Sequence, residues 1–539
     1  MKASNILAST ARATSYNMLL QVTIRVMTFV LNAVVLRYIS RDLLGVVNVR
    51  LTLLYSTVLF LTKEAFQKAC LSRRDSQDWR QVINLMWCTF PLGVLISTLL
   101  SMVWLYLLET PDPSIVASYG VGVVAFAVSG CLEILAEPLF VTGQAFLFIK
   151  LKVLSLGLSQ AVKCVVAVVL VLALPHWGIY SFALAQLLSS LTYVAIYYAY
   201  FTRYVTSRAK NDDGDNFPLM SVSDFFPHAI PGKALFDVHV VHLTWSFFKQ
   251  SFLKQILTEG ERYVMTFLDV LSFADQGVYD VINNLGSLVA RFIFLPIEEN
   301  GYLFFSQTLN RAKPAKEQAQ DCIQLSSRVL GVLVKIVTLI GCTVVVFGYA
   351  NSYLALHIYG GQSLSTGTGP TLLRWYCVYV LLLAVNGVTE GFVFATMSKE
   401  QVDRYNQKML VLSVLFLTTS WFLTTQIGSV GFILANCFNM ALRITHSIIF
   451  IWKYFENTSY TPLAEIIPSG PVIATLAVSF IITSISERQW VMQGNLLGNL
   501  LHIGVNGICL LAVLGTVFFT EKNMVQVIRD QLLHKHHTE

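Results

Sequence analysis

Residues 82 to 108 read VINLMWCTFPLGVLISTLLSMVWLYLL, a run of 27 residues without a charge. A helix needs about 20 mostly apolar residues to cross the hydrocarbon core of a bilayer, so this run is long enough to span it. Similar runs recur along the chain, which predicts an all-α polytopic membrane protein. The fourteen predicted spans are 16–38, 44–62, 82–108, 118–143, 149–174, 177–201, 246–270, 277–297, 329–349, 370–397, 408–425, 428–452, 470–486 and 494–519.

The composition of the whole chain excludes most other classes of protein. Of 539 residues, 55% are hydrophobic and only 13% are charged, against about 25% charged residues in an ordinary soluble domain. A soluble enzyme is therefore nearly excluded, and a net charge of +6 is too small to indicate a nucleic-acid-binding protein. The nine cysteines show no CxxC or Cys/His spacing, so neither a disulfide framework nor a zinc site is expected.

Catalytic motifs are also missing from the sequence. It contains no GxxxxGK(S/T) phosphate loop, no nucleophile elbow and no HExxH pair. We therefore expect no enzyme, no cofactor and no metal, and consider transport instead. Transport is expected to be passive or ion-coupled, not driven directly by ATP.

The positive charges predict the orientation of the chain. One set of alternate connections holds 24 Lys and Arg, whereas the other holds only Arg41 and Arg488, plus Arg37 if it lies outside the first span. Cytosolic connections are enriched in Lys and Arg, so both termini and the long connection 202–245 are expected in the cytosol. The sequon at Asn457 lies on the same side and should not be glycosylated.

Three matches between distant segments predict an internal repeat. Leu44–Val49 resembles Gln276–Val281, Ser129–Glu133 resembles Asn386–Glu390, and Gly178–Gln186 resembles Gly428–Asn436. Similar offsets in the same order indicate a duplication of six spans, and an even number of spans gives the copies the same orientation. The predicted domains are an N-lobe 1–201, a cytosolic linker loop 202–245, a C-lobe 246–455, two further spans within 456–519 and a cytosolic tail 520–539.

Ionisable residues inside the spans are the candidate functional residues. A charge at the centre of a membrane helix costs about 2.5 to 3.5 kcal/mol, so such side chains should face a partner or a water-filled cavity. The set consists of Arg25, Arg37, Arg50, Glu133, Glu137, Glu261, Arg262, Arg291, Glu390 and Arg443. Asn32 shares the Arg25 face of the first span, two helical turns away. A cavity rich in arginine suits an anionic group, because the guanidinium fork binds phosphate bidentately.

Several of these residues have a purely structural alternative. Arg37, Arg50 and Lys63 lie near predicted span ends and would snorkel to the headgroups. Glu261 with Arg262, or Glu133 with a buried arginine, would form pairs that only fix helix packing. Glu137 precedes Pro138 and would mark a break in the helix.

Three polar stretches resemble a known family. They are Leu257–Met265 (LTEGERYVM), Phe294–Glu299 (FLPIEE), and Lys63–Phe66 (KEAF) before Arg73 and Arg74. Over essentially the whole chain, the sequence resembles the eukaryotic endoplasmic reticulum proteins implicated in translocation of dolichol-linked oligosaccharide. That family resembles in turn the multidrug/oligosaccharidyl-lipid/polysaccharide exporter superfamily. The resemblance implies two six-helix lobes plus two extra helices, with a central cavity that opens alternately to either side.

The resemblance also implies a substrate, Man5GlcNAc2-diphosphodolichol, and the chemistry of that substrate gives roles to the candidate residues. The diphosphate would be held by Arg25, Arg37, Arg262, Arg291 and Arg443. Sugar hydroxyls would be bound, or the arginines balanced, by Asn32, Glu133, Glu261 and Glu390. Lys63, Glu64, Glu298 and Glu299 would form charged helix ends with a gating role. The implied partners are this lipid-linked oligosaccharide and the membrane lipids, and we expect a monomer in the endoplasmic reticulum membrane.

Alternative interpretations remain open. The protein would instead be a non-transporting accessory of the dolichol pathway, or an ion-coupled exporter of small solutes. The missing carboxylate in the first span counts against a cation exporter. Asp237, His239 and His242 suggest either a metal site or, as favoured, an interfacial segment with ordinary polar residues. Residues 1–15 have the composition of a transit peptide, and 535–539 resemble a retrieval signal or a solvated tail.

Overall fold

A computed structural model of the chain describes residues 26–72, 78–211, 217–230, 234–311, 313–456, 458–462, 467–491, 495–522 and 524. All regular elements in these residues are helical, so the all-α prediction is confirmed. Five of them are π-helical segments within or at the ends of longer helices. Such segments add a residue to one helical turn and are frequent at functional sites.

The described helices account for most of the predicted spans. Eleven are long and apolar enough to cross a membrane, or twelve if the bent pair Tyr119–Ile134 and Glu137–Ala145 is one span. Of the predicted span 16–38, the described residues contain the short apolar helix Val26–Leu36. The predicted span 246–270 is interrupted at Glu259, where one helix ends and the next begins, because a charged residue and Gly260 follow the last apolar turn. The number fourteen therefore stays a prediction.

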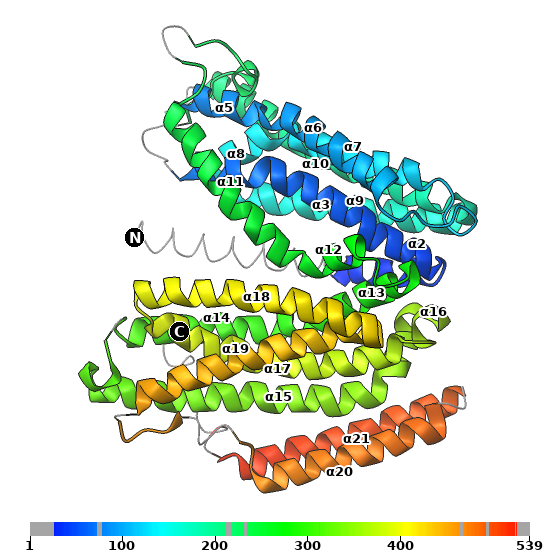
Figure 1. The fold of residues 1–539 in the computed structure, drawn as a ribbon, viewed down its shortest axis with the longest axis vertical. Coiled ribbons are helices and arrows are strands. Elements are labelled where there is room, and N and C mark those ends of the chain that lie inside the picture. Colours follow the sequence, from blue (N-terminus) through cyan, green and yellow to red (C-terminus); the bar gives the residue numbers. More distant parts are fainter. Residues whose placement is uncertain are drawn as a thin grey trace. The chain divides into compact units, whose positions relative to one another are not determined.

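The chain divides into two compact units, Met1–Gly277 and Val278–Glu539. After the helix Val26–Leu36, the first unit contains α2 (Arg41–Gly45), η1 (Val46–Leu51), α3 (Thr52–Leu59), η2 (Phe60–Glu64), α4 (Ala65–Leu71), α5 (Trp79–Trp87), α6 (Thr89–Met102), η3 (Val103–Leu107), α7 (Tyr119–Ile134), α8 (Glu137–Ala145), α9 (Ile149–Ala173), η4 (Pro175–Trp177), α10 (Ile179–Asn211), η5 (Val222–Phe225), α11 (Val238–Thr258), α12 (Gly260–Phe267) and the start of α13 (Phe273–Val289). In the second unit, α13 is followed by η6 (Ala290–Phe294), α14 (Leu295–Thr308), η7 (Ala315–Glu317), α15 (Gln320–Gly360), α16 (Gln362–Ser365), α17 (Gly369–Thr396), α18 (Lys399–Ile427), α19 (Val430–Phe455), α20 (Gly470–Ser486), η9 (Glu487–Val491) and α21 (Leu496–Thr520). These labels mark the helices in Figure 1.

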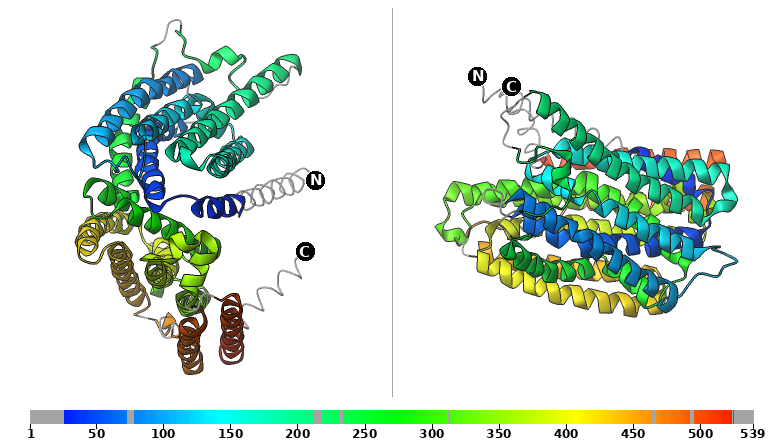
Figure 2. Two further views of the ribbon diagram at one scale, coloured as in Figure 1. Left: turned by 90° about the vertical axis from the view of Figure 1, so that its right-hand side faces the viewer. Right: turned by 90° about the horizontal axis from the view of Figure 1, so that it is seen from above.

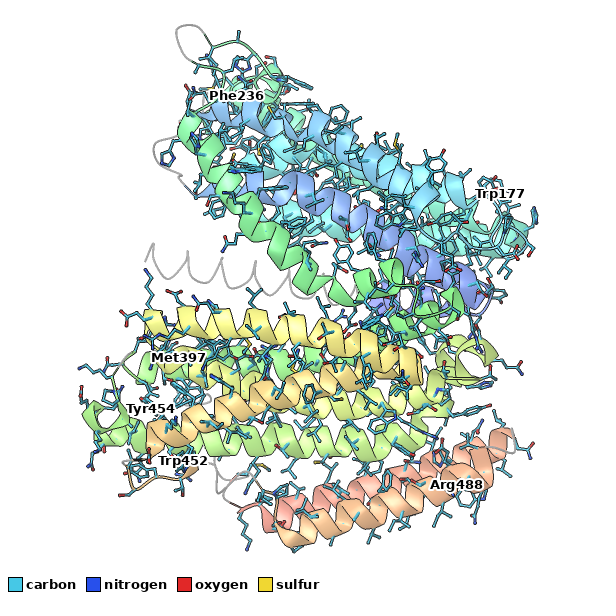
Figure 3. The ribbon with its side chains drawn as sticks, viewed as in Figure 1. Trp177, Phe236, Met397, Trp452, Tyr454 and Arg488 are labelled. Carbon is cyan, nitrogen blue, oxygen red and sulfur yellow. The ribbon has the colours of Figure 1, made fainter. Side chains whose placement is uncertain are left out.

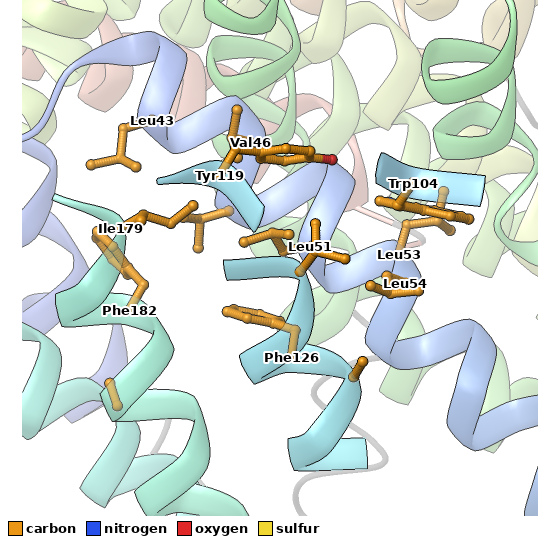
Figure 4. Close-up of a cluster of buried hydrophobic side chains, with 14 of the residues drawn as sticks. Leu43, Val46, Leu51, Leu53, Leu54, Trp104, Tyr119, Phe126, Ile179 and Phe182 are labelled. Carbon is orange, nitrogen blue, oxygen red and sulfur yellow. The ribbon is translucent and has the colours of Figure 1, made fainter. Parts of the chain in front are cut away.

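A buried apolar cluster holds the first unit together. Leu51, Phe126 and Trp104 have no exposed surface and bring the second predicted span, η3 and α7 into contact (Figure 4). The indole N–H of Trp104 donates to the backbone oxygen of Arg50 at 3.0 Å, so the ring packs without an unsatisfied polar group. Since lipid is as apolar as these side chains, close packing and such hydrogen bonds stabilise the bundle.

The segment between α10 and α11, expected as a linker loop, packs against the first unit wherever it is described. The indole N–H of Trp87 donates to the Phe225 carbonyl at 2.8 Å, and the Asn84 side chain bonds the backbone of His228 in both directions. Phe217 and Phe225 are buried. Helix α11 then lies against α4, so α11, expected in the C-lobe, groups with the first unit. The predicted lobe boundaries stay a prediction.

The second unit is a bundle of long helices with a hairpin beside it. Helix α17 packs against α15 and α19, α18 packs on α19, and the α20–α21 hairpin lies along α15 (Figures 1 and 2). Helix α15 extends from Gln320 to Gly360, well beyond the predicted span 329–349. Its 41 residues correspond to about 60 Å, which is longer than a bilayer core.

Residues predicted near the cytosolic side and residues predicted near the lumenal side lie at opposite ends of each unit. In the second unit, Arg488 lies at the far end from Met397, Trp452 and Tyr454 (Figure 3). The first unit shows the same separation between Trp177 and Phe236. This arrangement agrees with the alternation of Lys- and Arg-rich connections on which the predicted orientation rests.

Candidate functional site

A charged cluster lies inside the first unit, centred on Lys63. Its ammonium is 3.0 Å from a carboxylate oxygen of Glu133 and 3.0 Å from one of Glu137. The hydroxyl of Tyr55 donates to the other oxygen of Glu133, and the Gln67 amide donates to Glu137 at 2.5 Å. Because the Glu137 side chain has no exposed surface, these partners replace the water that the carboxylate loses on burial.

The local backbone brings these residues together. Lys63 lies in the π-helical segment η2, and Glu137 lies where α7 and α8 meet at a bend of 44°. Pro138 follows in the first turn of α8, where its missing N–H costs no helical hydrogen bond. The expected helix break at Glu137 is present, and the turn at Leu135 and Ala136 places its carboxylate beside that of Glu133.

The second unit holds a similar cluster around Glu390. A guanidinium nitrogen of Arg443 is 2.5 Å from one oxygen of Glu390, and Asn386 donates to the same oxygen at 2.8 Å. The hydroxyl of Tyr405 donates to the other oxygen. Glu390 is only 7% exposed, so α17, α18 and α19 meet at a buried carboxylate. Nearby, the Lys408 ammonium lies 3.3 Å from His446.

The two clusters occupy corresponding places in the predicted repeat. Glu133 and Glu390 end the matched segments Ser129–Glu133 and Asn386–Glu390, and each accepts a tyrosine hydroxyl and pairs with one basic side chain. The basic partner of Glu133 is Lys63, however, and not the buried arginine expected from the sequence. The π-helical segments η2 and η6 also begin 230 residues apart, close to the offset of the first match.

The remaining arginines predicted to hold the diphosphate differ in their surroundings. Arg25 lies outside the described residues. Arg37 is exposed at the turn after the helix Val26–Leu36, and Arg291 is exposed with its guanidinium donating to Ser287 at 2.6 Å. Arg262 pairs with Glu259 at 3.0 Å, one turn away in the interrupted span.

The other predicted polar residues are also scattered. Asn32 is exposed and accepts the weak S–H donor of Cys164 at 3.9 Å. Glu261 is half-buried in the first turn of α12. Among the described predicted residues, Lys63 pairs with Glu133, and Arg443 pairs with Glu390. Glu298 lies close to the second pair.

The residues predicted at helix ends do not lie there. The helix containing Lys63 and Glu64 continues to Leu71, and the one containing Glu298 and Glu299 continues to Thr308. The first helix can continue past these charges because each of them is paired. Lys63 pairs with Glu133, and Glu64 pairs with Lys68 at 2.6 Å. Glu298 is half-buried against Gly387 of α17, whereas Glu299 is exposed.

Arg50 does not snorkel, contrary to its structural alternative. Its side chain is fully buried and donates to the Thr266 carbonyl at 2.8 Å, and its guanidinium lies 5.1 Å from the ring centre of Phe273. Asp269 is 4.0 Å away. Long-range partners in the last turn of α12 and just after it thus decide the position of this charge. The distance of Arg50 from the end of its span does not reveal these partners.

Three basic residues inside predicted spans were missed as candidates. Lys163 in the middle of α9 lies 5.9 Å above the ring of Phe126. Lys335 pairs with Glu521 at 3.0 Å, and Arg374 pairs with Glu487 at 2.7 Å. These two ion pairs connect both ends of the α20–α21 hairpin to the bundle. A complete scan of each apolar run for Lys and Arg would have found all three.

Asp237 has a structural role. Its carboxylate accepts the backbone N–H of His239 at 2.8 Å and caps the N-terminus of α11. In the part of the chain that the structure describes, no group of three or more His, Cys, Asp or Glu side chains has metal-binding geometry.

A cavity of about 860 Å³ opens beside the Lys63 cluster. It is lined by η2, by the flanking turns of α3 and α4, and by Phe247 of α11. Lys63, Glu64 and Lys68 contribute its charges, and Tyr55, Gln67 and two serines contribute further polar groups. Its size is that of a site for a small organic ligand.

Long apolar helices in both units, with ion pairs buried among them, define a polytopic α-helical membrane protein. The fold is similar to that of the lipid II flippase MurJ in its inward closed conformation, with a TM-score of 0.58 and 10% identity over 94% of this chain and 99% of that chain. It is also similar to an inward-facing multidrug resistance MATE family transporter of the MOP superfamily, with a TM-score of 0.54 and 12% identity over 82% and 99% of the two chains. At these identities the likeness shows the fold alone.

The chain belongs to the Rft protein family, whose model (Rft-1) matches residues 9–531. It is 52% identical over 536 residues to the Man(5)GlcNAc(2)-PP-dolichol translocation protein RFT1 of Xenopus tropicalis, covering 99% of both chains. It is 51% identical over 532 residues to the Mus musculus protein of the same name, covering 99% of this chain and 98% of the relative. The family resemblance carried by the LTEGERYVM, FLPIEE and KEAF stretches is confirmed.

Proposed function

We propose that this protein moves Man5GlcNAc2-diphosphodolichol from the cytosolic to the lumenal leaflet of the endoplasmic reticulum membrane, for protein N-glycosylation. The observation that carries the proposal is the 52% and 51% identity, over nearly the full length, to proteins named for translocation of this lipid. The likeness in fold to a lipid II flippase supports it.

The chemistry of the substrate explains why a protein is needed. A diphosphate and seven sugars are too polar to cross hydrocarbon unaided, because unpaired polar groups and charges there cost several kcal/mol each. The polyprenyl tail remains in lipid throughout. Consumption of the product in the lumen would give the movement its direction, so no ATP hydrolysis is required and the protein acts as a transporter and not as an enzyme.

Alternating access is the proposed mechanism. The proposal includes fourteen spans, two six-helix lobes in parallel repeat with two further helices, and both termini in the cytosol. The matched surroundings of Glu133 and Glu390 support the repeat. The Lys- and Arg-rich connections support the orientation.

The candidate residues receive roles within this mechanism. Arg25, Arg37, Arg262, Arg291 and Arg443 are proposed to hold the diphosphate. Asn32, Glu133, Glu261 and Glu390 are proposed to bond sugars or balance basic side chains, and Lys63, Glu64, Glu298 and Glu299 to take part in gating. The ion pair between Arg443 and Glu390 supports the role of Arg443. Glu390 orients the guanidinium until the diphosphate competes for it.

Reconstitution tests the proposal directly. Purified protein in vesicles that contain labelled Man5GlcNAc2-diphosphodolichol should speed arrival of the label in the opposite leaflet, relative to protein-free vesicles. The variants Arg291→Gln and Arg443→Gln should slow it. Equal rates with and without protein would overturn direct translocation. If these variants then still abolished N-glycosylation in cells lacking the native protein, an accessory role would replace it.

A further inference from the structure

The cavity beside Lys63 has a lining whose charges are already neutralised. Lys63 is shared by Glu133 and Glu137, and Lys68 pairs with Glu64 at 2.6 Å. These two ammonium groups therefore face three carboxylates within ion-pair distance. A diphosphate entering this space would meet no surplus of positive charge, so a multiply charged anion is a poor occupant.

The same lining has unused hydrogen-bonding capacity. Each ammonium carries three donors, and Lys68 spends two of them on Glu64 and on the Ser251 hydroxyl at 3.2 Å. The hydroxyls of Ser56 and Ser72 donate to backbone carbonyls of their own helices, which leaves their oxygens as acceptors. Both donors and acceptors thus face the space.

Aromatic rings complete the wall. Phe60 and Tyr55 come from the helix that carries Lys63, and Phe247 comes from α11. A lining that combines rings with donors and acceptors fits a ligand that has both apolar C–H faces and hydroxyl edges. Sugars are such ligands, since their hydroxyls need hydrogen bonds and their C–H faces pack on rings.

We propose that this cavity is a subsite for uncharged hexose residues of the lipid-linked oligosaccharide. The inference rests on the proposed function and refines it, because it separates the place where sugars bind from the arginines proposed for the diphosphate. Its volume of about 860 Å³ accommodates part of the glycan. The carboxylates of Glu133 and Glu137 then serve chiefly to neutralise and hold Lys63.

Glycan binding to the full-length protein in nanodiscs tests the proposal. The probes are the free Man5GlcNAc2 glycan, inorganic pyrophosphate and dolichyl phosphate, each followed by ligand-observed nuclear magnetic resonance. Phe247→Ala should weaken glycan binding by about fivefold to tenfold, since one ring contact is removed. It should leave binding of pyrophosphate and of dolichyl phosphate unchanged. Phe252→Ala is the matched control, because Phe252 lies on the same helix but is 49% exposed and outside the cavity.

Further variants and a second assay separate the outcomes. Phe247→Leu keeps the apolar volume but removes the ring, and it replaces Phe247→Ala if that variant does not fold. Unchanged glycan affinity in the folded variant would overturn the subsite, even where translocation in vesicles is normal. Equal loss of pyrophosphate binding would overturn it too. A third outcome separates the two proposals. If Phe247→Ala loses glycan binding but the native protein does not translocate the lipid, the subsite is retained and the proposed function is rejected.

Discussion

Gly45 and Gly277 touch each other backbone to backbone, although 232 residues separate them in the chain. A Cβ atom added to Gly277 would lie 2.7 Å from the Gly45 nitrogen and 2.6 Å from the Arg41 carbonyl oxygen. A Cβ atom on Gly45 would collide with the Phe273 carbonyl oxygen. The two glycines occupy matching positions in the predicted repeat, and their contact lies within the first unit.

This contact predicts that neither glycine tolerates a side chain. Gly45→Ala and Gly277→Ala should each destabilise the protein by about 2 to 3 kcal/mol or more, because backbone atoms cannot move aside as side chains do. Gly120→Ala is the control in α7, since its Cβ would meet only a leucine methyl group at 3.6 Å. Apparent melting temperatures in detergent measure the difference. A melting temperature for Gly277→Ala equal to that of Gly120→Ala would contradict the close approach.

Removal of Lys63 should cost more than removal of either of its partners. Lys63→Met leaves Glu133 and Glu137 buried without a cation, whereas Glu133→Gln or Glu137→Gln leaves one carboxylate to pair with the ammonium. Breaking a buried pair from one side costs about 3 to 5 kcal/mol. Thermal unfolding of the three variants should therefore rank Lys63→Met lowest. A lower melting temperature for Glu133→Gln would refute this ranking.

The pair between Glu390 and Arg443 should show strong coupling. Glu390→Gln removes the negative partner of a guanidinium that is 2.5 Å away, and Arg443→Gln leaves a carboxylate that is only 7% exposed. Each single change should cost about 3 kcal/mol, and the double variant should cost less than the sum of the two. A double-mutant cycle on thermal stability measures the coupling. Additive effects would show that the two side chains act independently.

Glu521 should make stability depend on pH. Burial opposes the charged form, but the backbone N–H of Ser469 at 2.8 Å and the Lys335 ammonium at 3.0 Å hold the pKa of Glu521 below its ordinary value. A lowered pKa in the folded protein contributes stability above the ordinary glutamate pKa, and that stability is lost as the pH falls through the lowered value.

The variant Glu521→Gln tests this dependence. It should lose about 1.5 to 3 kcal/mol at pH 7, the range for a hydrogen bond to a charged group. Its melting temperature should also change less than that of the native protein between neutral and acidic pH. Glu456→Gln, at the end of α19, serves as a control on an exposed carboxylate. Parallel pH profiles for Glu521→Gln and the native protein would rule out the proposed linkage.

The apolar runs predicted most of the spans because membrane helices depend on local composition. The run 82–108 and the helix Trp79–Leu107 agree closely, as do 428–452 and Val430–Phe455. Ends were predicted less well, since α15 continues for 9 residues before 329 and 11 after 349. Hydropathy marks where a helix lies in lipid, and not where its hydrogen bonds end.

The candidate site was predicted in part. Glu133, Glu390 and Arg443 stood out because charge is rare inside apolar runs, and the structure gives each a charged partner. The identity of those partners was not predictable, because Lys63 and Glu133 are 70 residues apart and meet only after the bundle packs. The alternative that Arg50 snorkels was wrong for a similar reason, since the carbonyl of Thr266 to which it donates is 216 residues away.

The sequence by itself determined the class of protein, the positions of most spans and the family, because these follow from local apolar length and from residue identity. The tertiary structure alone decided which charges neutralise one another. Lys63, expected at a helix end, is the centre of a buried charged cluster, and a cavity lies beside it. Ion pairing in a low-dielectric interior depends on distances of a few ångströms between separate helices, and no pattern along one helix encodes those distances.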